Sequence, residues 1–295
     1  MEENKEFKKN WHDKYYRKLL LIPLVLLVAS LIYLGSYYNN TGDFFAKDIS
    51  LTGGTSVTIY DSIDAIKLET DLANKLEDIN TREIFDVITQ EQKAVIIETK
   101  SDGDLTRQVL QDYLGYELAE ENSSFEFTGS ALSESFYHQL IIALIVAFVF
   151  MGLVVLIIFR TTIPSSAVII SALADIIMTL ALVNILGIKM STAGIVALLM
   201  LIGYSVDTDI LLTNRVLKRD EGSLNKRIYG AFKTGTTMTL TSLLALALAL
   251  IIISSFSIVL SQIFTILVIG LGFDLLNTWI TNVSIIKWYA EKRQI

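Results

Sequence analysis

The chain has 295 residues, of which 52% are hydrophobic, and its formal net charge is −7. A soluble core does not require apolar runs as long as those in this sequence, and an acidic balance disfavours nucleic acid and other anionic partners. The sequence contains no cysteine, which excludes disulfides, thiol chemistry and thiolate metal sites.

Six apolar runs predict an α-helical polytopic membrane protein, because each run is close to the ~20 residues that cross a ~30 Å hydrocarbon layer. The first run has a basic flank and no small-residue cleavage site after it, so we expect a retained anchor and not a removed signal peptide. The fourth run is apolar up to Leu201 and then becomes polar. The six predicted spans are 19–38, 136–159, 163–186, 189–212, 232–253 and 262–286.

The distribution of lysine and arginine predicts the orientation. These residues concentrate in the N-terminal tail (1–18), in the connection between the fourth and fifth spans, and in the C-terminal tail (287–295). The connection between spans three and four has only Lys189, and the connection between spans five and six has none. The positive-inside bias therefore predicts a multi-pass protein of the cell membrane with both termini in the cytoplasm.

In this topology the large polar segment at 39–135 forms an extracytoplasmic domain, and spans two to six lie within 136–286. The segment contains 20 acidic and 7 basic residues, a net charge of −13. Such a surface is attractive to basic segments, although acidic surfaces often serve only solubility.

Periodicity predicts a small α+β domain in this segment. The run "ISLTGGTSVTIYD" is typical of a strand with a bend at Gly53 and Gly54. A helical pattern follows in "DAIKLETDLANKLEDI", then two strands in "REIFDVI" and "KAVIIET". A second helix is predicted from an Asp104 cap to Gly115, and "SSFEFTG" closes as a strand. The order β-α-β-β-α-β is that of a ferredoxin-like unit.

The segment contains no nucleophile–base pair, metal cluster or phosphate loop. It therefore resembles a binding or mechanical module more than an enzyme.

Acidic residues inside the predicted spans are the main functional signal. At 1.5 Å per residue, Asp207, Asp175 and Asp274 lie roughly 12, 17 and 20 Å from the inner boundary. A central aspartate costs about 2.5 to 3.5 kcal/mol, which argues for a use. Burial favours the neutral form of a carboxyl group. We therefore expect the three to converge as candidate proton carriers; the alternative is neutral aspartates that only join neighbouring helices.

Other polar residues near these aspartates are open to two interpretations. Asp209 is about 200° from Asp207 around a helix; it is either a further candidate for proton coupling or a solvated residue near the surface. Lys233 is the nearest cation that could face a buried aspartate, although its side chain could also reach the interface. The fifth span opens with hydroxyls at helical spacing, which could support a water chain or join helices. These hydroxyls belong to Thr234, Thr237 and Thr241.

Two motifs in this context resemble those of a known family. "DISLTGGTSVTIY" is similar to the strand that follows the first span in SecF proteins, and "GYSVDTDILLTNRV" is similar to the fourth-span motif. The resemblance covers nearly the whole chain: one span, a small extracytoplasmic domain, then five spans. It points to the archaeal branch of SecF, within a SecD/SecF family related to the resistance-nodulation-division transporters.

The resemblance assigns roles residue by residue. Gly203 to Asp207 matches the SecD and transporter form of the fourth-span motif, which implies that Asp207 takes part in proton passage. Bacterial SecF proteins have Asn and then Asp at the positions that align with Asp207 and Thr208 of this chain. The acidic residue of this chain therefore stands one position earlier than theirs. Asp175 fits a third-span His-Asp element, with Ala174 in place of the histidine.

The fifth span also departs from the bacterial pattern. The arginine of bacterial members has no counterpart, because Tyr229 stands there; Lys233 or Arg227 could substitute for it.

The resemblance implies an auxiliary subunit of the Sec translocase. Its implied partners are SecD, a SecYE-type channel, the exported preprotein and membrane lipid; its implied energy source is the proton-motive force, with no cofactor. Alternatives are a non-energised scaffold of the translocon and half of a small-molecule exporter. An intramembrane aspartyl protease is disfavoured, because its "GxGD" motif would need glycine where Ser205 and Val206 stand and its "YD" motif is missing from the third span.

Overall fold

The computed structural model describes residues 15–16, 18–86, 89–218, 222–254 and 257–293. Six of its helices are long and apolar enough to cross a membrane. The prediction of a helical polytopic membrane protein is therefore confirmed. Most of the basic N-terminal tail lies outside the described residues.

The six long helical segments follow the predicted runs but extend beyond several of them. The fourth span continues as a helix to Lys218, and the fifth begins at Leu224, eight residues before the predicted start. Hydropathy marks where a helix leaves hydrocarbon and not where it ends. The bounds are α2 Leu21–Thr41, α6 Ser130–Phe159, α7 Thr162–Ile185, α8 Thr192–Lys218, α9 Leu224–Ile253, α10 Ile258–Leu276, the π-helix η1 Asn277–Asn282, and α11 Val283–Arg293.

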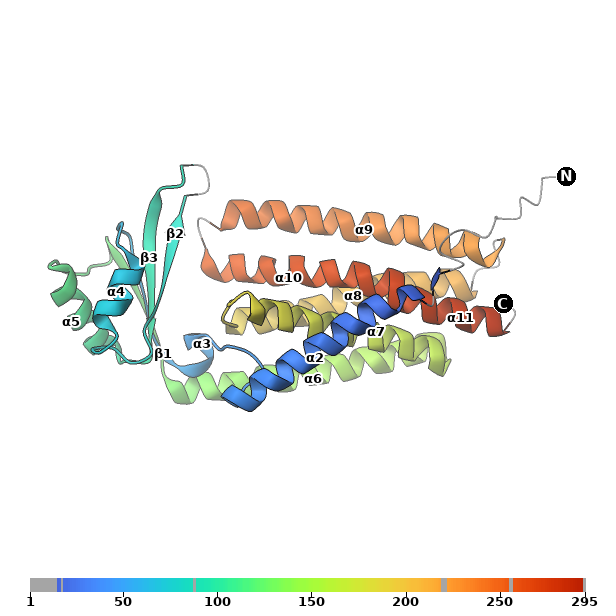
Figure 1. The fold of residues 1–295 in the computed structure, drawn as a ribbon, viewed down its shortest axis with the longest axis horizontal. Coiled ribbons are helices and arrows are strands. Elements are labelled where there is room, and N and C mark those ends of the chain that lie inside the picture. The colour runs from blue at the N-terminus through green and yellow to red at the C-terminus, as the bar shows by residue number, and fades with distance from the viewer. Residues whose placement is uncertain (1–14, 17, 87–88, 219–221, 255–256, 294–295) are drawn as a thin grey trace.

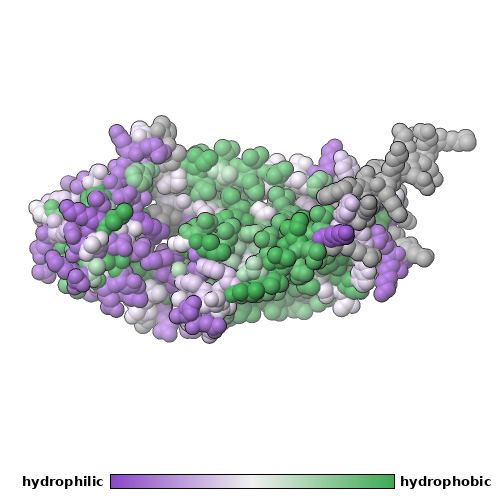
Figure 2. All heavy atoms as spheres, in the orientation of Figure 1, coloured by the Kyte–Doolittle hydropathy of each residue, from purple (hydrophilic) through white to green (hydrophobic). Residues whose placement is uncertain are grey.

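The helices form one bundle in which α7, α8 and α10 supply most of the interior. Helices α2, α6 and α9 expose large apolar side chains, such as Ile32, Ile157 and Ile252. The space-filling view shows this apolar surface along the bundle, with hydrophilic residues at both ends (Figure 2). Apolar surface of this extent is typical of a protein that faces lipid.

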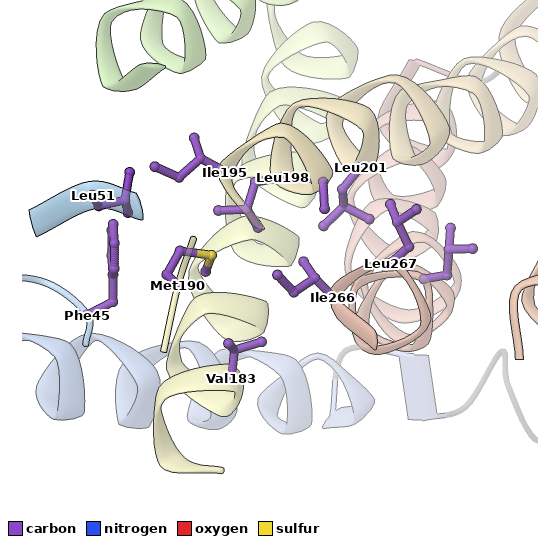
Figure 3. Packing of buried hydrophobic residues seen from close by; sticks show 11 residues of the cluster. Phe45, Leu51, Val183, Met190, Ile195, Leu198, Leu201, Ile266 and Leu267 are labelled. Carbon is purple, nitrogen blue, oxygen red and sulfur yellow. The ribbon is translucent and has the colours of Figure 1, made fainter. Parts of the chain in front are cut away.

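The largest buried apolar cluster joins α8 to α10 (Figure 3). Ile195, Leu198 and Leu201 of α8 lie against Ile266 and Leu267 of α10. A Cβ atom on Gly270 would overlap the side chain of Leu201, so the absence of a side chain there lets the two helices approach closely.

A four-stranded sheet with two helices lies at one end of the bundle, and we call it the sheet module (Figure 1). The strand order is β2-β3-β1-β4, and every neighbouring pair is antiparallel. The element order β-α-β-β-α-β agrees with the prediction. The elements are β1 Gly54–Ile59, α4 Ala65–Leu72, β2 Asn80–Phe85, β3 Gln92–Thr99, α5 Gly103–Leu114 and β4 Ser123–Thr128.

Two local predictions in this region are wrong. Residues Ile49–Thr52 form a short helix, α3, and not the first half of a strand, because the Asp48 side chain accepts a hydrogen bond from the Ser50 N–H and caps a helical turn. The cap of α5 is Asp102 and not Asp104, since its carboxylate accepts from the Asp104 N–H at 3.2 Å.

The predicted bend at Gly53 and Gly54 is present. Both residues have positive φ, +83° and +140°. A Cβ atom on Gly53 would overlap the Ser130 backbone at the start of α6, and one on Gly54 would overlap the Thr99 carbonyl. These glycines therefore let the chain pass from α3 into β1 while it packs against the start of α6.

The sheet module is fixed to the bundle through the segment between α2 and α3. The Met190 N–H donates to the Ala46 carbonyl at 2.7 Å, and the Asp48 N–H donates to the Met190 carbonyl at 2.9 Å. The Thr192 N–H, at the start of α8, donates to Ser50 Oγ. Backbone pairing thus joins the α7–α8 loop to the chain that leads into the sheet.

A buried ionic contact lies beside this joint. Glu98 of β3 is 4% exposed, contacts Arg82 of β2, and lies 3.9 Å from Lys189 Nζ in the α7–α8 loop. Burial raises the pKa of the Glu98 carboxyl and the nearby Asp48 charge adds to this, whereas Arg82 and Lys189 oppose it.

Candidate functional site

Three acidic side chains from three helices lie together inside the bundle. Asp175 of α7, Asp209 of α8 and Asp274 of α10 are each 0% exposed. Thr278 contacts both Asp209 and Asp274, and the neighbouring Asn277 contacts Asp175. We call these residues the carboxylate cluster.

The buried face of α8 places Asp209 in the cluster. Four other buried residues of this helix occur eight and four positions before Asp209 and three and seven positions after it. This is the spacing of one helix face. They are Leu201, Ser205, Leu212 and Val216.

Asp175 is held by two neutral donors. The Ser205 hydroxyl donates to Asp175 Oδ2 at 2.6 Å, and the Asn277 amide donates to Oδ1 at 2.7 Å. The carboxyl group therefore connects α7 with α8 and with the π-helix.

Thr278 lies between the other two carboxyl groups. Its Oγ1 is 2.8 Å from Asp209 Oδ1 and 3.1 Å from Asp274 Oδ1. The Asn282 amide also donates to Asp209 Oδ1, at 2.7 Å. One hydroxyl of η1 thus links aspartates of α8 and α10.

The π-helix brings Asn277 and Asn282 to the same cluster although they are five residues apart. An α-helix would turn two such residues about 140° away from each other. The wider turn of η1 reduces that angle, so one asparagine reaches Asp175 and the other reaches Asp209.

The hydrogen bonds of the cluster leave room for a proton on one of its carboxyl groups. The Thr278 hydroxyl has one hydrogen, which it shares between Asp209 Oδ1 and Asp274 Oδ1. A proton on Asp274 would strengthen the longer of these two contacts, because Asp209 Oδ1 already accepts from Asn282.

The charge around the cluster also favours a neutral carboxyl group. Within the described ranges, no lysine, arginine or histidine forms an ion pair with any of its three members. The Oδ2 atoms of Asp209 and Asp274 are buried and have no hydrogen-bond partner in the described part of the chain. Ionising all three groups in such surroundings would be costly.

Other predicted residues lie away from the cluster. Asp207 is exposed, as is Lys233 on α9. Around Gly203 there is open space where a Cβ atom would be, so no close packing depends on this glycine. The interpretation of Asp209 as a solvated residue is wrong, because the apolar spacing of α8 turns Asp209 inward and Asp207 outward.

The hydroxyls at the start of the fifth span do not reach the cluster. Thr234, Thr237 and Thr241 each donate to a backbone carbonyl of α9 itself, at 2.7 to 3.1 Å. Among the described residues, no group of three His, Cys, Asp or Glu side chains is arranged to hold a metal ion.

Sequence reasoning missed Asn277, Thr278 and Asn282. Asn277 and Thr278 lie three and four residues after Asp274, which is the spacing of one helix face. That spacing was a usable signal for polar partners of a buried aspartate, whereas Asn282 reaches the cluster only through the wider turn of η1.

Comparison with known proteins agrees with this architecture. The family model described as protein export membrane protein SecD/SecF, C-terminal, matches residues 110–292. A protein-export membrane protein SecF from Methanocaldococcus jannaschii is 37% identical over 286 residues, covering 95% of this chain and 97% of the relative. A SecF from Haloquadratum walsbyi is 38% identical over 292 residues, covering 93% of each chain.

A solved structure has the same fold. The crystal structure of SecDF, a translocon-associated membrane protein from Thermus thermophilus, matches with a TM-score of 0.73 at 20% identity. The match covers 94% of this chain but 38% of the SecDF chain. The family model and the relatives of similar length show that this chain belongs to the SecF family of protein-export membrane proteins.

Proposed function

We propose that this protein is an auxiliary subunit of the Sec protein translocase that acts with SecD and uses the proton-motive force to promote export. The carboxylate cluster supports this proposal most directly. It holds three buried carboxyl groups; two of them share the Thr278 hydroxyl, and the Oδ2 atoms of Asp209 and Asp274 have no hydrogen-bond donor among the described residues. A group that gains or loses a proton there changes the hydrogen bonds that join α7, α8 and η1.

The energy available is sufficient for such a step. One elementary charge that crosses 100 mV releases about 2.3 kcal/mol, which is comparable to the cost of leaving a buried hydrogen-bonding group unpaired. Protonation of the cluster could therefore shift α8 against its neighbours, and α8 begins at the joint with the sheet module.

We also propose that both termini are cytoplasmic and that the sheet module, within 39–135, faces the other side of the membrane. The end of α11 lies at the bundle end opposite the sheet module (Figure 1), and its last turn contains Lys292 and Arg293. Tyr16 donates to Glu291 at 2.9 Å, so the first and last described segments lie at the same end. The positive-inside bias assigns this end to the cytoplasm.

The proposed partners are SecD, a SecYE-type channel and the preprotein in transit, in a role without catalysis. A non-energised scaffold of the translocon is the main alternative. A small-molecule exporter is less well supported, since the relatives that match nearly end to end are named for protein export.

Two neighbouring substitutions on α8 test the proposal. Asp209→Asn removes a titratable group from the cluster, whereas Asp207→Asn removes an exposed carboxylate from the opposite face. Export of a secreted reporter is measured in cells with and without an uncoupler. Wild type and Asp207→Asn should export faster when the gradient is intact, by about tenfold or more. Asp209→Asn should export at the uncoupled rate in both conditions.

If Asp209→Asn retained its dependence on the gradient, the cluster would not be the coupling site. Equal export by all three proteins, with or without the uncoupler, would favour the scaffold.

A further inference from the structure

A groove of about 390 Å³ lies between the sheet module and the end of the bundle. Its sheet side is formed by β2 and Ile96 of β3, and its bundle side includes Ile188, Gln262 and Thr265. β2 lies on the side of the sheet nearest the ends of α9 and α10 (Figure 1). We call this space the β2 groove.

The β2 groove runs along the edge of the strand. Four consecutive residues, Arg82 to Phe85, line it. Neighbouring side chains of a strand point to opposite faces of the sheet. A cavity lined by all four must therefore lie beside the backbone itself, which offers hydrogen-bonding groups to whatever enters.

The edge of β2 is open beyond Thr81. Among the described strands, β2 has a neighbour on one side only, and none of its six residues is fully buried. The Thr81 N–H points away from β3 and donates to Glu69 of α4 at 3.1 Å, which occupies that end of the edge. By the period of two, the Glu83 backbone groups also face away from β3, on the groove side of the strand.

The bundle side of the groove is rigid. Gln262 is 9% exposed, accepts a hydrogen bond from the Ser191 hydroxyl, and donates to the Lys189 carbonyl. Both ends of its amide are engaged, so the bundle side of the groove is formed before anything binds.

The charge of the surroundings favours a basic occupant. The segment 39–135, which contains the sheet module, has 20 acidic and 7 basic residues. Arg82 and Glu83 are the charged residues that line the groove; Arg82 is engaged by Glu98, and Glu83 Oε1 accepts a hydrogen bond from the Ala65 N–H, so the attraction comes from the charge of the whole module. An extended chain with lysine or arginine residues would therefore be attracted to this side of the molecule.

We propose that the β2 groove binds an extended segment of the polypeptide being exported, one that carries basic residues, as an additional strand on β2. This inference rests on the proposed role in export. A translocase must accept many sequences, and strand addition suits that need because the main chain supplies the hydrogen bonds. The exposed Phe85 side chain and the Ile84 and Ile96 side chains add apolar contacts that tolerate many residue types.

The absence of native cysteine allows a direct test by disulfide crosslinking. Phe85→Cys places the single thiol at the β2 groove. Phe127→Cys is the matched control, since Phe127 is an exposed phenylalanine on the opposite edge strand, 60% exposed against 46% for Phe85. Membranes that hold each variant with the complete translocase are loaded with a preprotein stalled by a folded C-terminal domain. The preprotein carries one cysteine at successive positions.

We expect crosslinks from Phe85→Cys to exceed those from Phe127→Cys by about fivefold or more, the factor that one net hydrogen bond provides. Crosslink yield should alternate along the preprotein with a period of two, as a strand requires. Replacing three neutral residues of the stalled segment by lysine should raise the yield, and replacing them by glutamate should lower it.

Equal yields from the two positions, or yields without alternation, would overturn the proposal. Crosslinking of Phe85→Cys to another subunit in place of the preprotein would also overturn it, because the groove would then be a subunit interface. Export of the unstalled preprotein is measured in the same membranes. If export still depends on this chain while Phe85→Cys gives no crosslink, the β2 groove proposal fails and the proposed function stands.

Discussion

The buried acids of this molecule fall into two kinds that differ in their neighbours. Glu98 lies against Arg82 and near Lys189, so its charge is compensated. The carboxylate cluster is surrounded by hydroxyl and amide groups, which can stabilise either protonation state. A compensated charge is suited to holding two parts together, whereas an uncompensated one is suited to exchange of a proton.

The burial of Glu98, which outweighs the compensating effect of its basic neighbours, predicts how stability depends on pH. Because burial raises the pKa of Glu98, the folded chain binds this proton more tightly than the unfolded chain. The contribution to stability is fully present below the ordinary carboxyl pKa and is lost as the pH rises through the raised value. Across this window, the melting temperature of the wild type in detergent should fall more steeply than that of Glu98→Gln.

Glu126→Gln, on the exposed part of β4, is the control and should retain the wild-type slope. Parallel slopes for the wild type and Glu98→Gln would show that Glu98 does not titrate on unfolding.

Single positions on a helix were also where prediction from sequence was least reliable. Depth in the membrane identified Asp175 and Asp274 correctly as residues that converge. Depth could not distinguish Asp207 from Asp209, since they differ by only about 3 Å along the axis. The rotation of α8 decides between them, and the spacing of Leu201, Leu212 and Val216 fixes that rotation.

At the level of elements, α10 depends on close contact with α8. A methyl group on Gly270 would meet the Leu201 side chain, whereas Gly272 of the same helix has open space at that position. Gly270→Ala should therefore lower the free energy of unfolding by about 1–3 kcal/mol through overpacking. Gly272→Ala should leave it unchanged or raise it by up to about 1 kcal/mol. Thermal unfolding followed by circular dichroism measures both.

A loss of stability of the same size in both variants would mean that the glycines act through the helix backbone and not through packing against Leu201.

Element types were largely predictable, and element ends were not. Hydrophobic runs predicted all six spans, and alternating patterns predicted the order of strands and helices in the sheet module. The π-helix at Asn277–Asn282 had no sequence signal, because it depends on contacts that the two asparagines make with aspartates of other helices. The helix at Ile49–Thr52 depends on one capping contact by Asp48.

At the level of the whole molecule, α8 connects the two candidate regions. Its first residue, Thr192, is bonded to Ser50 beside the sheet module, and Asp209 lies about 26 Å further along the same helix. A displacement of α8 that follows protonation would therefore act on the joint that carries the sheet module. The β2 groove lies between the sheet and the same end of the bundle.

The central claim is that the carboxylate cluster holds a proton when the protein is at rest, and infrared spectroscopy tests it most directly. In reconstituted protein at neutral pH, the carbonyl stretch of a protonated carboxyl group should be present in the wild type and in Asp207→Asn. It should be absent or strongly reduced in Asp274→Asn, which removes the carboxyl group that lies 3.1 Å from Thr278 Oγ1. A wild-type spectrum without this band, or a band that Asp274→Asn retains and Asp207→Asn loses, would contradict the account.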